Sequence, residues 1–303
     1  MDGYDVGFCL HTRIGGIGLL PESQQPRRTR KRLTRRSRVS TATIFTPMNP
    51  DETPEEHFPL QTVYGRTSQP RFVNRYDSRE ILLVIDGSCI NNGGVSQPVT
   101  GGCSFAYKGA GKSGITTAFP FSSLCHDEGG TVGFPLEQTG PGGEYHVASS
   151  NRAKLRAVIA GLEFREWQQE GWKRIVIATD LQYVAFGATR WLASWVRRRW
   201  KTRKARQVAN RDLWEELHGA IDKLARLGTE VSFWLISSGS SVKQASSLVQ
   251  DTKEVAREAA KLHFDTAAEE FTRLWHRGVK HSPFLARLCT ITMLLGGHWT
   301  VKC

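Results

Sequence analysis

Two aspartates accompany stretches of the chain that have the length and composition of buried strands. Asp86 lies in the apolar run Ile81–Cys89, and Asp180 directly follows Arg174–Thr179. A single aspartate in such a place most often caps the next turn, and burial of its charge without a partner is unfavourable. Two strands that each deliver a carboxylate at their end instead indicate one shared, polyanionic site of the kind that binds metal ions.

The segments that must position these aspartates begin with a group of short strands. Apolar or alternating runs predict five strands, at Ile81–Cys89, Gly101–Lys108, Ser113–Phe121, Lys173–Thr179 and Glu230–Ile236. The first three follow one another closely and predict an antiparallel meander. The Gly- and Pro-rich stretch Ser122–Gly143 predicts an excursion on the surface.

Helical spacing of apolar residues predicts the elements that flank the sheet. One helix begins from an N-cap at Ser149 or Ser150 and ends near Gly171. Three more are expected at Tyr183–Lys204, Arg211–Leu227 and from Val242 toward Phe271. A strand that returns after a helix of this length pairs parallel with the first strand. The predicted fold is α/β, a mixed five-stranded sheet of three antiparallel strands followed by parallel crossovers, flanked by helices.

The net charge of +12 is concentrated in two places along the 303 residues. Arg27–Arg38 contains eight basic residues and Arg197–Arg206 contains seven, and neither stretch contains an acid. A localised basic surplus suits a polyanion such as nucleic acid. The second cluster is interleaved with tryptophans, Trp191, Trp195 and Trp200. Trp191 and Trp195 share one helical face, so ordinary helix core is an equal alternative for them.

The composition also predicts how the chain is divided and where it acts. We expect a basic, largely disordered tail at 1–78, a folded domain at 79–270 and a C-terminal tail of unknown role at 271–303. The basic stretch Pro26–Arg38 favours the nucleus, with a mitochondrial transit segment as the alternative. The six scattered cysteines indicate free thiols in a reducing compartment. No apolar stretch approaches the ~18 residues of a membrane span, and Asp2 and Asp5 disfavour a secretory signal. We expect a monomer.

Several motifs in order give the chain a resemblance to a known family. They are IDGSCINNGG, ASSNRAKLRAVIAGLEFREW, IVIATDLQYV, GATRWLASWVRRRWKT, NRDLWEEL and VSFWLI, over about residues 79–260. The chain resembles ribonuclease H type 1 in its fungal form, and the resemblance implies the RNase H-like fold. The family cleaves the RNA strand of RNA/DNA hybrids with two Mg²⁺ ions held by four carboxylates. Two metals placed about 4 Å apart stabilise both the attacking and the leaving oxygen.

The resemblance transfers only two of the four acids. The first falls on Asp86 and the third on Asp180, but the second falls on Lys154. The fourth falls on Ser246 within VKQASSLV, or on Lys253 in an alternative register on KEVAREAA. We therefore expect Mg²⁺ binding at Asp86 and Asp180 to be weak or absent. An ammonium at Lys154 can take the place of one metal ion and neutralise either aspartate.

The resemblance also implies residues that contact nucleic acid. Ser149 and Asn151 would touch phosphate and the 2′-hydroxyls of RNA, with Gln182 beside them, although Asn151 can equally be an ordinary residue of a helix start. The remaining set matches the basic protrusion with which the family grips the DNA strand. Its members are Trp191, Trp195, Arg197, Arg198, Arg199, Trp200 and Lys201.

These observations predict a protein that binds RNA/DNA hybrid or double-stranded RNA and cleaves it poorly or not at all. One rival is an active ribonuclease H with a rearranged site that recruits Asp251, Glu254 or Glu163. Another is a protein-interaction scaffold or a decayed copy. A Mg²⁺-dependent cleavage assay separates the first two hypotheses, and loss of hybrid binding in a gel shift would favour the third.

Overall fold

The computed structural model describes most of the chain from Val39 onward. The described residues are 39–63, 70–91, 99–109, 116–117, 130–237, 241–261, 270–275 and 278–280. These described residues belong to one compact unit. The basic stretch Pro26–Arg38, on which the predicted localisation depends, lies outside the described residues, as do residues 281–303 of the predicted C-terminal tail.

A mixed sheet with the strand order β1-β9-β8-β4-β5-β7-β6 forms the centre of the fold. Its strands are β1 (Thr43–Ile44), β4 (Glu80–Ile90), β5 (Thr100–Ala106), β6 (Thr116–Thr117), β7 (Thr131–Pro135), β8 (Arg174–Thr179) and β9 (Glu230–Leu235). β4, β5 and β7 pair antiparallel, whereas β8 pairs parallel with β4 and β9 pairs parallel with β8. The predicted mixed α/β fold is confirmed. The strands β1 and β7 were not among the five expected, and β6 covers two residues of the strand predicted at Ser113–Phe121.

The third strand of the meander lies later in the chain than predicted. It is β7, inside the stretch expected to be a surface excursion, and in Ser113–Phe121 the structure describes only the two-residue strand β6, parallel to β7. The sequence TVGFP reads as a loop because of its Gly and Pro. Gly133 is there for a different reason, since a Cβ at this position would lie 2.5 Å from Val255 Cγ1 of a covering helix.

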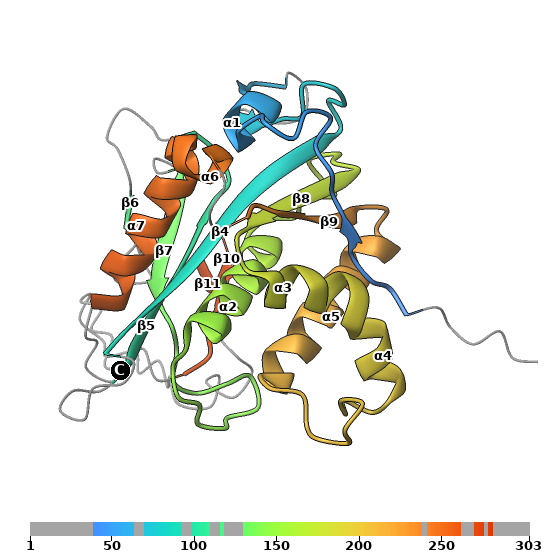
Figure 1. The fold of residues 1–303 in the computed structure, drawn as a ribbon, viewed down its shortest axis with the longest axis vertical. Helices are drawn as coiled ribbons and strands as arrows, with labels where there is room; N and C mark the ends of the chain where they lie inside the picture. The colour runs from blue at the N-terminus through green and yellow to red at the C-terminus, as the bar shows by residue number, and fades with distance from the viewer. Residues whose placement is uncertain are drawn as a thin grey trace, which may run out of the picture. The chain divides into compact units, whose positions relative to one another are not determined.

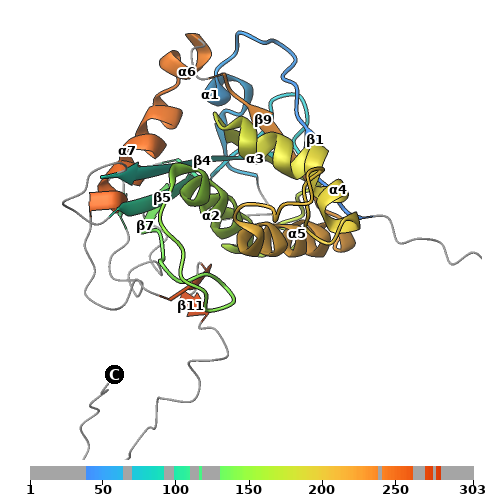
Figure 2. The ribbon, with the colours of Figure 1, turned by 60° about the horizontal axis from the view of Figure 1, so that its bottom comes forward.

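Helices cover both faces of the sheet (Figures 1 and 2). They are α1 (Pro54–His57), α2 (Ser150–Glu163), α3 (Gln182–Phe186), a π-helical turn (Gly187–Trp191), α4 (Leu192–Arg197), α5 (Arg211–Arg226), α6 (Ser241–Ala245) and α7 (Ser247–Lys261). The helix predicted over Tyr183–Lys204 ends at Arg197, and α2 ends eight residues before Gly171. Among the described helices none is long and apolar enough to cross a bilayer.

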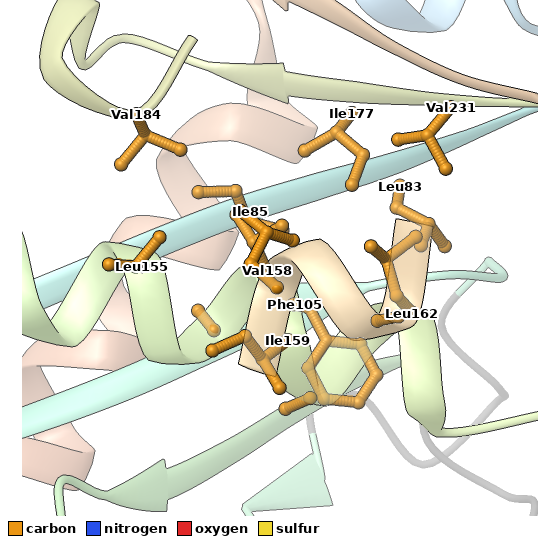
Figure 3. Packing of buried hydrophobic residues seen from close by; sticks show 14 of the residues in the cluster. Leu83, Ile85, Phe105, Leu155, Val158, Ile159, Leu162, Ile177, Val184 and Val231 are labelled. Carbon is orange, nitrogen blue, oxygen red and sulfur yellow. The ribbon is translucent and has the colours of Figure 1, made fainter. Parts of the chain in front are cut away.

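The core has two parts because successive residues of β4 face opposite sides of the sheet. Leu83 and Ile85 pack against α2, with Val158 and Leu162 (Figure 3). Leu82 and Val84 belong to the second cluster, which α7 completes with residues such as Leu248. β4 is therefore buried on both faces, as its continuous apolar sequence indicates.

The folded domain begins before residue 79, which corrects the predicted boundary. β1 pairs parallel with β9, and a separate two-stranded sheet joins β2 (Leu60–Gln61) to β3 (Arg71–Phe72). Phe58 is fully buried in the cluster around Trp234. These elements are too short to show a periodicity, so the stretch from Val39 to Ser78 resembled a tail.

The domain also continues past residue 270. β10 (Arg273–Trp275) and β11 (Gly278–Lys280) form a small antiparallel sheet. Leu274 is buried, and Arg273 donates to Glu163 on α2 and to Glu216 on α5. The first residues of the predicted C-terminal tail are thus packed on the helices.

Candidate functional site

The parallel pairing of β4 and β8 brings together Asp86, which lies inside β4, and Asp180, which directly follows β8. The strands are paired in parallel as far as Val84 and Ala178, so two residues later Asp86 and Asp180 lie side by side. Asp86 is 6% exposed, and its Oδ1 accepts a hydrogen bond from the backbone N–H of Gly87 at 2.7 Å. The shared site predicted from the two strand ends is therefore formed by the fold.

The first turn of α2 delivers a third charged group to the same place. Ser149 caps the helix by accepting from the backbone N–H of Arg152 at 3.2 Å. Gly87 lets the helix approach closely, because a Cβ there would lie 2.5 Å from the backbone nitrogen of Lys154. A bulkier residue at 87 would push α2 and Lys154 away from β4.

Lys154 joins both aspartates in one ion cluster. Its Nζ lies 2.8 Å from Oδ1 of Asp86 and also donates to Oδ1 of Asp180. The side chain is nearly buried, with 9% of the residue exposed. Burial by itself lowers the pKa of Lys154, but the charges of Asp86 and Asp180 outweigh it and hold this pKa above its usual value. The ammonium therefore stays protonated at neutral pH.

This arrangement does not fit a divalent cation. The space between the two aspartates that a metal ion would share holds the ammonium of Lys154. Within the described part of the chain, no group of three or more His, Cys, Asp and Glu side chains is arranged to hold a metal ion. A dication next to an ammonium is strongly repelled, since each unit interaction is worth roughly 3 kcal/mol at ~5 Å and an effective dielectric near 20.

Ser246 lies elsewhere and has a structural role. Its Oγ donates to Oε2 of Glu55 at 2.7 Å and accepts from the backbone N–H of Val249 at 3.1 Å, as a helix N-cap does. Oε1 of Glu55 accepts from the backbone N–H of Leu248 at 2.6 Å. Ser246 and Glu55 together accept hydrogen bonds from the backbone N–H groups at the start of α7. The contacts of Ser246 therefore do not support the alignment that places the fourth family acid at this position.

The second register, on Lys253, agrees with the packing of α7. Asp86 pairs across the sheet with Ser104, and the Ser104 hydroxyl donates to the backbone carbonyl of Thr252 at 2.6 Å. Residues directly opposite on paired strands share a face, so this part of α7 lies at the height of Asp86. Ser246 precedes Thr252 by six residues, roughly 9 Å along a helix. The position next to Thr252 is the half-buried Lys253.

The acids that a rearranged site would recruit are not gathered around Asp86. Glu163 lies at the other end of α2, nine residues or roughly 13 Å from Lys154, and bonds to Arg273. Glu254 is exposed and pairs with Arg257 at 3.1 Å. Asp251 is also exposed, on the outer side of α7.

The three tryptophans of the basic cluster are not equivalent. Trp191 is 39% exposed, and its ring lies 5.7 Å from that of Trp195. Trp195 is partly buried and packs on Trp214 with ring centroids 5.1 Å apart. Trp200 is only 9% exposed and belongs to the core. Trp191 is thus available at the surface, whereas Trp200 mainly supports the loop after α4, which leaves little of its ring for a bound strand.

The basic side chains around these rings face solvent. Arg197, Arg198, Arg199 and Lys201 are all exposed, and none of them makes an ion pair with another described residue. Arg199 and Trp200 have φ of 54° and 62°, two successive residues in the left-handed region that end the helical path after α4. A cleft of about 430 Å³ opens here, lined by Arg190, Trp191, Ser194, Trp195, Arg198, Thr202 and Arg203. Arg190 was not among the predicted contacts, because it lies before the basic stretch Arg197–Arg206.

The residues predicted to contact phosphate and ribose lie at the starts of α2 and α3. Asn151 and Gln182 are exposed, and Ser149 is partly exposed although its hydroxyl caps α2. The starts of both helices flank the Lys154 cluster, because α2 carries Lys154 and α3 begins two residues after Asp180. The structure therefore brings these predicted contacts to the same side of the site.

Two supporting residues were not found from the sequence. Glu55 reaches α7 from the short helix α1, whose capping box at Thr53 and Glu56 was the available signal for an ordered element there. Asp212 binds Arg152 through two bonds of 2.9 and 2.6 Å and so ties α5 to the first turn of α2. Burial raises the pKa of Asp212, but Arg152 outweighs this and the pKa lies below its usual value.

Comparison with known sequences identifies relatives. Residues 78–225 match the family model of RNase H. Ribonuclease H of Cyanothece sp. is 32% identical over 126 residues, 42% of this chain and 70% of the relative. Ribonuclease H of Treponema pallidum is 32% identical over 145 residues, which are 48% of this chain and 75% of the relative. Ribonuclease H of Xanthomonas oryzae pv. oryzae is 46% identical over 82 residues, which are 27% of this chain and 51% of the relative. The chain thus spans about half the length of that relative.

Solved structures resemble the chain in fold alone. The foamy viral protease-reverse transcriptase in complex with RNA/DNA hybrid has a TM-score of 0.41 at 13% identity, covering 59% of this chain and 20% of that one. LC9-RNase H1, described as a type 1 RNase H with the type 2 active-site motif, has a TM-score of 0.39 at 21% identity. The match covers 68% of this chain and 79% of that one.

Proposed function

Because the chain belongs to the ribonuclease H family, we propose that it binds RNA/DNA hybrids or double-stranded RNA without cleaving them efficiently. The observation that carries this proposal is the ammonium of Lys154 between Asp86 and Asp180. The family generally uses Mg²⁺, and here a fixed cation stands where the two acids would share one. The protein is then a type 1 ribonuclease H homologue, of the fungal form by its motifs, with a neutralised centre.

The charges around the centre support this reading. Two aspartates and Lys154 carry a net charge of −1, and Lys253 at the height of Asp86 brings the sum to zero. Four carboxylates would instead concentrate four negative charges, enough to hold two dications. A neutral cluster has little affinity for Mg²⁺ but still pairs the carboxylates of Asp86 and Asp180 with a cation. Folding and the shape of the binding face do not depend on the metal.

The surface away from the centre supports nucleic-acid binding. Arg197, Arg198, Arg199 and Lys201 are exposed on one loop next to Trp191, an arrangement that suits phosphates and sugars of a duplex. Asn151 and Gln182 lie on the side of the cluster where a second strand would pass. The basic residues beside Trp191 and the Lys154 cluster lie on different elements. Nucleic-acid binding can therefore be retained while the metal site changes.

The proposal is tested by titrating a fluorescent RNA/DNA hybrid into the protein with Mg²⁺ and with EDTA. We expect the same dissociation constant in both conditions at equal ionic strength, because no contact is routed through a metal. A single-stranded oligonucleotide of the same sequence and a DNA duplex serve as competitors. Affinity that depends strongly on Mg²⁺, or no preference for hybrid or double-stranded RNA over duplex DNA, would contradict the proposal.

A further inference from the structure

A second hollow lies at the carboxyl ends of β1 and β9. The residues that line it are different from the predicted nucleic-acid contacts. It has a volume of about 320 Å³. Its lining contains no charged side chain and consists of Ile44, Phe45, Thr46, Pro47, Pro50, Phe186, Trp234, Leu235, Ile236, Ser237 and Val242. The segment from Ile44 to Pro50, N-terminal to the part of the chain that matches the family, builds one wall.

This hollow adjoins the basic cleft through one shared wall. Phe186 lines the hollow, and the guanidinium of Arg190, which lines the cleft, lies 4.0 Å from the centre of the Phe186 ring. The ring of Trp191 follows at 6.4 Å from Phe186. A line of aromatic rings with an arginine beside it therefore leads from the protrusion to the hollow.

The hollow also lies next to the ion cluster. Ile236 at its edge donates its backbone N–H to the carbonyl of Thr179 at 2.9 Å, and Thr179 immediately precedes Asp180. Inside it, the partly exposed ring of Phe45 packs on Trp234, which is 5% exposed, with ring centroids 5.5 Å apart. The exposed Thr46 adds a hydroxyl group to the lining. An uncharged, planar group with a polar edge fits this chemistry, and a phosphate does not.

We propose that this hollow receives a nucleobase from a single-stranded segment that continues from the bound hybrid. The proposal rests on the proposed function and adds a substrate class, a hybrid with a single-stranded extension. Arg190 holds the backbone while the base stacks on the partly exposed rings of Phe45 and Phe186, the combination that binds single strands without sequence preference. The volume is sufficient for one base, with room for a purine.

The test compares a blunt hybrid with hybrids that carry short DNA or RNA extensions at either end. One base in each extension is 2-aminopurine, whose fluorescence falls when it stacks on an aromatic ring. We expect one class of extension to bind roughly fivefold or more tightly than the blunt hybrid, the lower end of what one stacked base contributes. The 2-aminopurine signal should fall at one position of that extension.

Two variants locate the effect. Thr46→Trp fills the hollow, and Met48→Trp adds the same side chain two residues away, where the residue is 76% exposed and does not line the hollow. Thr46→Trp should abolish the advantage of the extension and leave blunt-hybrid affinity unchanged, whereas Met48→Trp should retain both. Ile44→Trp, on a lining residue that is 41% exposed, repeats the test if Thr46→Trp fails to fold.

The outcomes separate the two proposals. If blunt hybrid binds but no extension improves affinity or quenches 2-aminopurine, the hollow is not a base site and the proposed function stands. If filling the hollow leaves the advantage intact, the extension binds elsewhere and the inference is wrong. If no hybrid binds at all, the proposed function fails and this inference fails with it.

Discussion

At the scale of single residues, the exchange of a carboxylate for Lys154 changes both the charge and the stability of the centre. The local charge differs by two units from that of a family member with an acid there. The same ammonium stabilises two nearly buried acids that would otherwise repel each other. Lys154 has therefore become part of the fold, and its removal does not simply reopen a metal site.

Replacement of Lys154 by Met should destabilise the protein by about 3–5 kcal/mol at neutral pH, since it leaves buried charges without a partner. The raised pKa of Lys154 means that its contribution to stability is present below the unfolded value of 10.5 and is lost only as pH rises through the folded pKa. The wild-type contribution is thus constant between pH 5 and 8. Urea unfolding at both pH values measures the effect.

The stability of the Lys154→Met variant should change between pH 5 and pH 8, the range in which the contribution of Lys154 to the wild-type protein is constant. With no cation, one carboxyl of the adjacent pair takes a pKa above its usual value. Protonation then favours the folded state, so the deficit relative to wild type should be smaller at pH 5 than at pH 8. Lys173→Met, at an exposed lysine just before β8, is the matched control and should change stability by less than about 0.5 kcal/mol. An equal effect of both variants would mean that the ion cluster contributes nothing.

Restoring acids at both substituted positions should restore cleavage. Lys154→Glu alone removes the competing cation and supplies one ligand, with little turnover expected. Adding Lys253→Asp supplies the fourth acid at the height of Asp86, and cleavage of a labelled hybrid with Mg²⁺ should appear. The two changes should be strongly non-additive because they act through shared ions.

A second double variant, with the fourth acid at position 246 instead of 253, serves as the matched control. Lys154→Glu with Ser246→Asp should stay inactive, because position 246 faces Glu55 and a second carboxylate there is repelled. Activity in that pair and not in the Lys253 pair would overturn the register inferred from Ser104 and Thr252. Asp86→Asn in the active background should abolish cleavage.

At the scale of elements, the loop after α4 and the helices around the ion cluster have separate tasks. The loop contains the buried Trp200 and exposes a series of basic side chains to solvent. α2 and α7 are fixed by residues outside this loop, through the contacts of Arg152 with Asp212 on α5 and of Ser246 with Glu55 on α1. A change in the loop should therefore alter binding without disturbing the centre.

Changing Arg197, Arg198 and Arg199 to Ala should weaken hybrid binding about equally for all sequences. Each lost phosphate contact should lower the slope of log affinity against log salt by ~1. The control removes the same charge elsewhere, with Lys173, Arg226 and Arg257 changed to Ala, all of them exposed. Anisotropy titrations at several salt concentrations compare the two. If both triple variants lose the same slope, the arginines act through net charge and not through contact.

At the scale of the whole molecule, the sequence predicted the parallel pairing of the strands at Ile81–Cys89 and Lys173–Thr179 and a Lys154 that neutralises Asp86 or Asp180. Long apolar runs and a helix of crossover length leave few alternative topologies. The sequence placed the third strand of the meander too early in the chain, because the Gly and Pro of β7 are typical of a loop. It did not predict the first forty residues of the domain, since β1 and α1 are too short to show a period and depend on contacts with β9 and α7. The choice between Ser246 and Lys253 also needed tertiary contacts, because the break between α6 and α7 hides the register.

The most direct test of the account is the fate of the RNA strand in a hybrid that the protein has fully bound. The RNA is end-labelled, the protein is in excess over its dissociation constant, and Mg²⁺ is present at several millimolar. We predict that the RNA remains intact for hours while an active ribonuclease H degrades the same hybrid in parallel. Mg²⁺-dependent shortening of the RNA that disappears in Asp86→Asn would contradict the account.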